Sequence, residues 1–341
     1  MNLKKIIFIN FAVFLSFIIV IEIVFGYWFK DNNFGIYLRS ERNVKQIITY
    51  HHNKDKLKHT YKRNFYAFRG DEFNPSEVKI VFLGGSTGNQ RFTPEKFTIV
   101  GILNKLFKQN NLNLKIFNAS TDGKSTRGYV NDFLYWFPKI PNFKPKTFIF
   151  YIGINDSNFS SDWSKHYDYK FANNNILKIR DYIKNNSITF ELINKFENKY
   201  FPKITDAYFK TDESLYKNFN YINFHKAKIK FANIKKTDEE RTMVKTFNER
   251  LRNLKIQIEK FNVKPIFITQ IKYNGSADRP LFLINQELKK FCKNNNYNIV
   301  ALDELIQNIN KEDFFDPVHT TIAGSNKIAN TLYFELAKIL K

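Results

Sequence analysis

Four short motifs hold residues whose types could act together in one reaction. They are centred on Ser86, Gly123, Asn155 and His319. Ser86 offers a hydroxyl nucleophile, and His319 offers a base, with Asp316 three residues earlier to orient it. The backbone N–H groups of Ser86 and Gly123 and the side-chain amide of Asn155 could stabilise an oxyanion. Together the motifs predict acyl transfer through a serine, with Ser86, Asp316 and His319 as the catalytic residues.

Five apolar runs are predicted to be strands, and these strands must position the residues named above. The runs are Val78–Leu83, Leu114–Phe117, Thr147–Ile152, Pro265–Thr269 and Asn298–Leu302. Continuous apolar strands separated by helical patterns predict a parallel sheet covered by helices on both faces. Ser86, Gly123 and Asn155 follow the first three runs, at the carboxyl ends of the strands, where open parallel sheets bind ligands.

Two helices have clear sequence signals. Residues 237–240 read Thr-Asp-Glu-Glu, a capping box that predicts a helix start, and apolar residues recur at helical spacing up to Ile258. A second helix is expected after His319, running to about Ile339. Ser86 follows the first strand and Gly85, at the expected start of a further helix, so its backbone N–H is expected to be free.

The N-terminus carries a long apolar run. Ile6–Phe29 is interrupted only by Asn10, Glu22 and Gly26, and about 20 apolar residues cross a bilayer as a helix. Two lysines precede the run, and no small-x-small cleavage site follows it. We therefore expect residues 1–30 to be an uncleaved signal anchor, with the protein a single-pass membrane protein whose catalytic domain lies on the extracytoplasmic side. A buried core helix is the alternative.

The remaining chain divides by composition. Residues 31–65 are polar and basic, which predicts a juxtamembrane stalk. Residues 66–341 are predicted to form the catalytic domain. An insertion at about 158–236 interrupts that domain, and it is polar, basic and rich in aromatic residues. It is either a small helical subdomain or a lid and substrate wall, because it begins directly after the motif of Asn155.

Composition bounds the partners. The formal net charge is +22, which favours attraction to anionic envelope polymers or lipid head groups. No zinc-knuckle, helix-turn-helix or similar pattern accompanies the charge, so nucleic acid is not an expected partner. The single cysteine, Cys292, excludes an internal disulfide and is expected in the core. No set of residues at ligand spacing predicts a metal, and the sequence predicts no cofactor.

The chain from Val78 to the C-terminus, minus the insertion, resembles the SGNH/GDSL hydrolase superfamily. The motifs that match are Ser86, the stretch Asn118 to Gly123, the third motif Gly153, Asn155 and Asp156, and finally Asp316 with His319. The resemblance implies that Ser86 is the nucleophile and that Gly123 and Asn155 join it in the oxyanion hole. One departure is Gly85, where the family often has Asp.

The resemblance also implies a fold and a set of activities. The fold is a flavodoxin-like three-layer α/β/α arrangement without a metal. The activities are those of esterases, lipases, thioesterases, carbohydrate O-acetylesterases and some O-acetyltransferases. We expect a serine esterase acting on an O-acetyl or other acyl ester of an acylated carbohydrate or lipid of the cell envelope. An O-acetyltransferase of cell-envelope polysaccharide and a catalytically silent envelope scaffold are the alternatives, and the complete set of motif residues argues against the scaffold.

Overall fold

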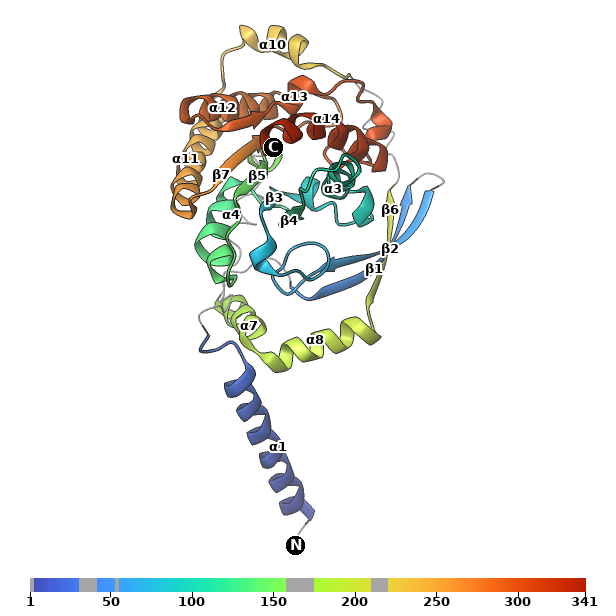
Figure 1. The fold of residues 1–341 in the computed structure, drawn as a ribbon, viewed down its shortest axis with the longest axis vertical. Coiled ribbons are helices and arrows are strands. Elements are labelled where there is room, and N and C mark those ends of the chain that lie inside the picture. The colour runs from blue at the N-terminus through green and yellow to red at the C-terminus, as the bar shows by residue number, and fades with distance from the viewer. Residues whose placement is uncertain (1–2, 31–41, 53–54, 158–174, 210–219) are drawn as a thin grey trace.

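A computed structural model describes residues 3–30, 42–52, 55–157, 175–209 and 220–341 (Figure 1). Its centre is a parallel five-stranded sheet in the order β4-β3-β5-β7-β8. The strands are β3 (Ile80–Gly84), β4 (Ile116–Asn118), β5 (Thr147–Tyr151), β7 (Lys264–Ile268) and β8 (Asn298–Val300). They coincide with the five predicted runs, and their order is the flavodoxin-like one, so the predicted α/β fold class is confirmed.

Helices cover both faces of this sheet and give three layers (Figure 1). On one face lie α4 (Thr126–Asn131), α11 (Asp238–Phe261) and α12 (Arg279–Asn295), and on the other α3 (Ile99–Gln109) and α14 (Ile322–Leu340). The predicted capping box starts α11: Thr237 accepts from the backbone of Glu240, whose side chain accepts from the backbone of Thr237. Cys292 is fully buried on α12, as expected.

Short elements complete this domain. The short α-helices are α2 (Ser86–Asn89), α5 (Ile154–Ser157) and α13 (Leu302–Leu305). The 3₁₀ and π turns are η2 (Pro75–Glu77), η3 (Glu95–Phe97), η4 (Asp132–Trp136), η5 (Phe137–Lys139) and η6 (Lys311–Asp313). The first two of the α-helices begin directly after β3 and β5, and they carry Ser86 and Asn155.

The segment expected to be a stalk forms part of a second sheet instead. Residues 44–52 and 55–63 are strands β1 (Val44–His52) and β2 (Asp55–Arg63), paired antiparallel, and β6 (Lys203–Phe209) joins β1 in parallel. The sheet buries apolar residues that include Ile48 and Tyr61 together with polar ones such as Arg63. Because the buried side chains are partly polar and charged, the alternation of a half-buried strand is hidden in the sequence.

The insertion is not purely helical. Its described part contains α7 (Asn175–Asn186), α8 (Ile188–Tyr200), strand β6 and α10 (Phe224–Ala232). The last of these packs against α12 through an aromatic cluster of Phe224, Phe231 and Phe282. Several aromatic residues of the insertion, including Trp163, Tyr167, Tyr169 and Tyr216, lie outside the described residues.

The apolar N-terminal run forms the helix α1 (Leu3–Phe25), which projects from the body (Figure 1). Among the described residues it is the one helix long and apolar enough to cross a membrane, a property that signal sequences share. None of its residues is buried, so α1 is not a core helix of this domain.

Candidate active site

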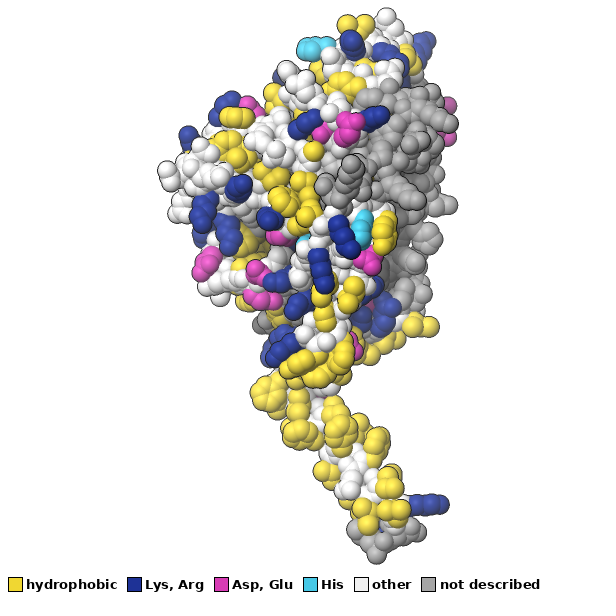
Figure 2. Space-filling view, turned by 90° about the vertical axis from the view of Figure 1, so that its right-hand side faces the viewer, with side chains coloured by type: hydrophobic (Ala, Val, Ile, Leu, Met, Phe, Trp, Pro, Cys, Tyr) yellow, Lys and Arg dark blue, Asp and Glu magenta, His cyan; other side chains and the backbone are white. Residues whose placement is uncertain are grey.

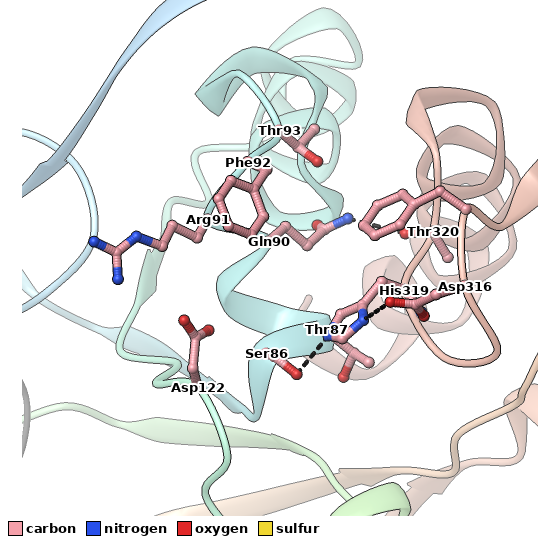
Figure 3. Close-up of a pocket in the computed structure, with 11 residues that line it drawn as sticks. Ser86, Thr87, Gln90, Arg91, Phe92, Thr93, Asp122, Asp316, His319 and Thr320 are labelled. Carbon is pink, nitrogen blue, oxygen red and sulfur yellow. Dashed lines mark hydrogen bonds and ion pairs between the residues drawn. The ribbon is translucent and has the colours of Figure 1, made fainter. Parts of the chain in front are cut away.

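Ser86, His319 and Asp316 form a continuous hydrogen-bonded chain (Figure 3). The Ser86 Oγ lies 2.7 Å from the His319 Nε2, and the His319 Nδ1 lies 2.6 Å from the Asp316 Oδ2. Ser86 is the first residue of α2, two residues after the end of β3, and the other two residues lie just before α14. The structure therefore brings together the three residues predicted as nucleophile, base and orienting acid.

The loop of Asp316 holds its carboxylate in one position. The Asp316 Oδ1 accepts from the backbone N–H groups of Val318 (2.8 Å) and His319 (2.7 Å), which leaves Oδ2 for the imidazole. Burial raises the pKa of Asp316, but these hydrogen bonds and the charge of His319 outweigh it, so the net pKa lies below the ordinary value of 3.8. The ring of Phe315 stacks on the imidazole, with centroids 5.7 Å apart. Asp316 is therefore ionised and fixed at neutral pH.

Gly123 and Asn155 are the predicted oxyanion donors. Gly123 lies in the loop that follows β4, and Asn155 lies in α5, just after β5. Gly123 has φ +66°, a conformation that favours glycine. Within the part of the chain that the structure describes, the N–H groups of Ser86 and Gly123 donate to no other residue. The Asn155 Nδ2 donates one hydrogen to the carbonyl of Lys124 (2.8 Å), and its second hydrogen is available.

Gly85 lies directly against the side chain of Asn155. A Cβ atom added to Gly85 would lie 2.4 Å from the Asn155 Nδ2, far inside van der Waals contact. In this chain the amide of Asn155 occupies the space that a side chain before Ser86 would need. The departure from Asp at Gly85 is thus matched by the local packing of the site.

Asp156 ties the third motif to the second. Its buried carboxylate accepts from the Thr126 N–H (3.0 Å), the Thr126 Oγ1 (2.8 Å) and the Arg250 Nη1 (2.9 Å). Thr126 begins α4, directly after the loop that contains Gly123. Asp156 therefore fixes the loop of Gly123 relative to the helix of Asn155.

Two buried glutamines, which have no motif around them, connect the parts of the site. The Gln90 Nε2 donates to the Oγ1 of Thr320 (3.0 Å), the residue after His319. The Gln270 Nε2 donates to the Oγ1 of Thr87 (2.9 Å), and its Oε1 accepts from the Ile154 N–H (2.7 Å). The helix of the nucleophile is therefore tied both to the loop of the base and to the helix of Asn155.

These contacts predict a positioning role for Gln90. We expect Gln90→Leu to lower kcat by up to about 10²-fold with little change in KM, because a small misplacement of reacting groups is costly. The matched control is Gln109→Leu, at an exposed position at the end of α3. Steady-state kinetics on a small activated ester would check this. Equal kcat values in the two variants, with equal thermal stability, would show that the Gln90 contact does not position the base.

A cavity of about 150 Å³ opens beside the Ser86 hydroxyl (Figure 3). Phe92 and Phe315 provide apolar walls, and Arg91 and Asp122 provide charged groups. The guanidinium of Arg91 donates to the Gln46 Oε1 (2.7 Å) and lies over the ring of Tyr61. Because Gln46 and Tyr61 belong to β1 and β2, the small sheet places one charged group of the cavity.

Two buried arginines hold the loops around the site. Arg63 is the last residue of β2, and Arg69 lies six residues beyond it. The Arg63 Nη1 donates to the carbonyl of Ser120 (3.0 Å), close to Gly123. The Arg69 guanidinium donates to the carbonyls of Gln90 (2.7 Å) and Thr93 (2.6 Å). The segment that composition marks as a stalk thus continues into the wall of the site.

The described residues contain no group of three or more His, Cys, Asp or Glu side chains that could hold a metal ion.

Comparison with known proteins identifies a family. The family model described as GDSL-like Lipase/Acylhydrolase matches residues 80–332. None of the curated proteins matches the chain in sequence. Solved structures that are similar include a catalytic mutant of an acetylxylan esterase from Geobacillus stearothermophilus, at 15% identity and a TM-score of 0.42, with 76% of this chain and 94% of that chain covered.

Two further structures are similar to this chain. One is an alpha/beta hydrolase enzyme from the metagenome of Lake Arreo, Spain, at 14% identity and a TM-score of 0.42, covering 76% of this chain and 94% of that chain. The other is a member of the lipolytic protein G-D-S-L family from Veillonella parvula, at 11% identity and a TM-score of 0.41. There 76% of this chain and 99% of that chain are covered.

Proposed function

Since this chain belongs to the GDSL-like lipase/acylhydrolase family, we propose that it is a serine esterase with Ser86 as its nucleophile. The observation that carries the proposal is the chain of hydrogen bonds from Ser86 through His319 to Asp316 at the edge of a cavity. A serine hydroxyl is a weak nucleophile unless a neighbouring base takes its proton, and this geometry supplies that base.

The proposed reaction has two acyl-transfer steps. The Ser86 Oγ attacks the ester carbonyl while His319 takes the hydroxyl proton, and Asp316 stabilises the imidazolium that forms. The negative charge on the carbonyl oxygen is held by the N–H groups of Ser86 and Gly123 and by the amide of Asn155. His319 returns the proton to the departing alcohol. Water, activated by the same imidazole, then releases the acyl group from Ser86.

The cavity favours a short acyl group. Its volume of about 150 Å³ is well below the roughly 300–1,000 Å³ of sites that enclose drug-sized ligands. Phe92 and Phe315 suit a small apolar acyl end, while Arg91 and Asp122 are placed to bind hydroxyl or charged groups of a saccharide. We therefore infer an O-acetyl ester of an envelope glycan as the substrate class.

This inference predicts a dependence on acyl length. With p-nitrophenyl esters, kcat/KM is expected to be highest for acetate and to fall as the acyl chain grows, because a longer chain does not fit beside Ser86. Measuring the series from acetate to decanoate checks it. A maximum at long chains would contradict the inferred substrate class, and faster transfer to an added saccharide than to water would identify a transferase.

We infer further that α1 is a single-pass anchor. Lys4 and Lys5 precede the helix and favour a cytoplasmic N-terminus, which places the catalytic domain on the extracytoplasmic side. Its 23 residues extend about 34 Å at 1.5 Å per residue, enough for the roughly 30 Å of a hydrocarbon core.

The predicted topology can be tested with reporters. Alkaline phosphatase fused after Lys341 is expected to be active in cells, while a green fluorescent protein fused there should be dark when exported in unfolded form. Replacing Lys4 and Lys5 by Glu is expected to lower the phosphatase activity. Fluorescence with an inactive phosphatase would contradict the topology, and a mature chain that begins near Trp28 would contradict the uncleaved anchor.

A further inference from the structure

The helix α8 has its polar side against the protein and its apolar side exposed. Leu192, Phe196 and Tyr200 are spaced by four residues, so they lie on one stripe of the helix, and all three are more than half exposed. The opposite side carries Glu191, which is buried, and Asn198, which accepts from the Lys45 N–H (3.2 Å). A surface helix of a soluble protein normally buries its apolar face. The arrangement in α8 is the reverse.

The neighbouring helix extends this apolar surface. On α7, Ile176, Ile179 and Ile183 recur at helical spacing and are all exposed. Beyond the end of α8, Phe201 and Ile204 are exposed as well. We call the exposed apolar residues of 176–204 the α7–α8 platform. Its large apolar side chains follow one another along the two helices, whereas the exposed apolar residues of a soluble protein are usually scattered singly.

Glu22 joins this platform to the end of α1. Its carboxylate accepts from the Ser187 Oγ (2.7 Å) and from the Thr189 N–H (2.9 Å) at the first turn of α8, and from the indole of Trp28 (2.8 Å). A carboxylate in an apolar helix needs such partners. Glu22 lies in the last turn of α1, so the start of α8 lies where α1 would leave the membrane.

Further contacts fix the angle between α1 and the platform. The Tyr27 N–H donates to the carbonyl of Asn186 (2.8 Å), and the ring of Trp28 lies edge-on to Tyr182 of α7, with centroids 5.7 Å apart. Figure 1 shows α7 and α8 between α1 and the rest of the body, and Figure 2 shows apolar side chains gathered where α1 meets the body. The platform is thus continuous with the apolar surface of α1.

Lysines border the platform. Lys184, Lys199 and Lys203 are exposed on or beside the two helices, and Lys195, which is also exposed, pairs with Glu191 (2.6 Å). Long basic side chains next to an apolar stripe place their stems along the acyl chains and their charges at lipid phosphates. This pattern matches the interface of a bilayer with anionic lipids better than the surface of another protein.

We propose that the α7–α8 platform lies in the interface of the membrane leaflet from which the C-terminal end of α1 emerges. The occupant of the apolar face is lipid. The proposal rests on the anchorage of α1 proposed above. It adds a second membrane contact, which holds the catalytic domain at a fixed height and tilt. Because α8 leads into β6 of the small sheet, and that sheet places Arg91, the platform is connected to the wall of the cavity through the small sheet.

Depth-dependent fluorescence quenching in the full chain tests the proposal. Cys292, the sole cysteine, is fully buried, so a cysteine introduced by Phe196→Cys or Leu192→Cys can be labelled under native conditions with an environment-sensitive dye. The matched control is Phe334→Cys on α14, because Phe334 is 63% exposed and Phe196 is 57% exposed. Each labelled chain is reconstituted in vesicles of phosphatidylcholine and phosphatidylglycerol, with or without lipids brominated high on the acyl chain.

The labels on α8 are expected to lose about half of their fluorescence to brominated lipid, because interfacial helices sit roughly 5–10 Å into the leaflet. The label at position 334 should be unaffected. Equal signals at all three positions in chains that float with the vesicles overturn the proposal but leave the anchorage intact. A second measurement adds a quencher that is soluble in water. If the labels on α8 are shielded from this quencher and are also not quenched by brominated lipid, protein covers the face and the proposal is overturned, while the anchorage remains. A chain that does not float overturns both.

Discussion

Ser86→Ala is expected to lower kcat on an acetyl ester by about 10⁶-fold, the size of loss seen when a catalytic serine is removed. The reason is that no acyl-enzyme can form once the Oγ is absent. The remaining activity should come from water acting beside the intact oxyanion donors. Initial-rate measurements with a chromogenic acetate ester would give the ratio.

The control for this variant is Ser76→Ala. Ser76 is exposed in the turn before β3, about ten residues from the nucleophile in sequence, and the substitution should leave kcat unchanged. If Ser86→Ala retained kcat within tenfold of the original chain, the hydrolysis would have another nucleophile and the proposed reaction would be wrong.

Asp316→Asn is expected to lower kcat by about 10⁴-fold while leaving the fold intact, because the amide stabilises the wrong tautomer of His319. In the original chain the pKa of Asp316 lies below its ordinary value, so the carboxylate is ionised at neutral pH and accepts the His319 Nδ1–H. An asparagine at this position can instead donate to Nδ1, which leaves Nε2 protonated and unable to take the Ser86 proton.

The comparison for Asp316→Asn is Asp122→Asn, in the same cavity. Asp122 accepts from the Asn89 side chain (2.8 Å) and is not bonded to the imidazole, so its replacement should act mainly on KM. Full pH–rate profiles of both variants separate the two roles. Similar kcat losses in both would mean that Asp316 acts only as another cavity residue.

The central domain was predictable because its signals are local. Each strand of the main sheet lies in a mainly apolar run, and the start of α11 is marked by the capping box of Thr237 and Glu240. Ser86 and Asn155 could be placed because each follows such a run directly. In parallel sheets these strand ends converge, so short motifs far apart in sequence predict one site.

The small sheet was not predictable in the same way. The partner of β1 on one side is β6, where Gln46 pairs with Lys203, 157 residues further along the chain, and the buried face of β1 carries Gln46 and His52 beside Ile48 and Tyr50. Gln90 likewise stands outside any motif, and its role comes from the hydroxyl of Thr320, which the fold brings close. Single polar residues give no periodic signal, so only their burial identifies them.

The sequence left two interpretations of the insertion open, a small helical subdomain or a lid and substrate wall, and the described residues bear on both. The insertion does contain helices, but β6 completes the sheet that carries Gln46, and Gln46 holds Arg91 at the cavity. Exchanging the whole insertion for a short linker would therefore also remove a strand. Point variants such as Arg91→Ala test the contribution of this wall more cleanly, because they leave β6 paired.

The most direct test of the proposed reaction is to identify the residue that a fluorophosphonate modifies. The full chain, in detergent, is treated with the reagent, digested and analysed by mass spectrometry. The geometry around Ser86 Oγ and His319 Nε2 predicts one adduct, on Ser86, and loss of esterase activity in proportion to labelling. An adduct on another serine with Ser86 unmodified, or full esterase activity after complete labelling of Ser86, would contradict it.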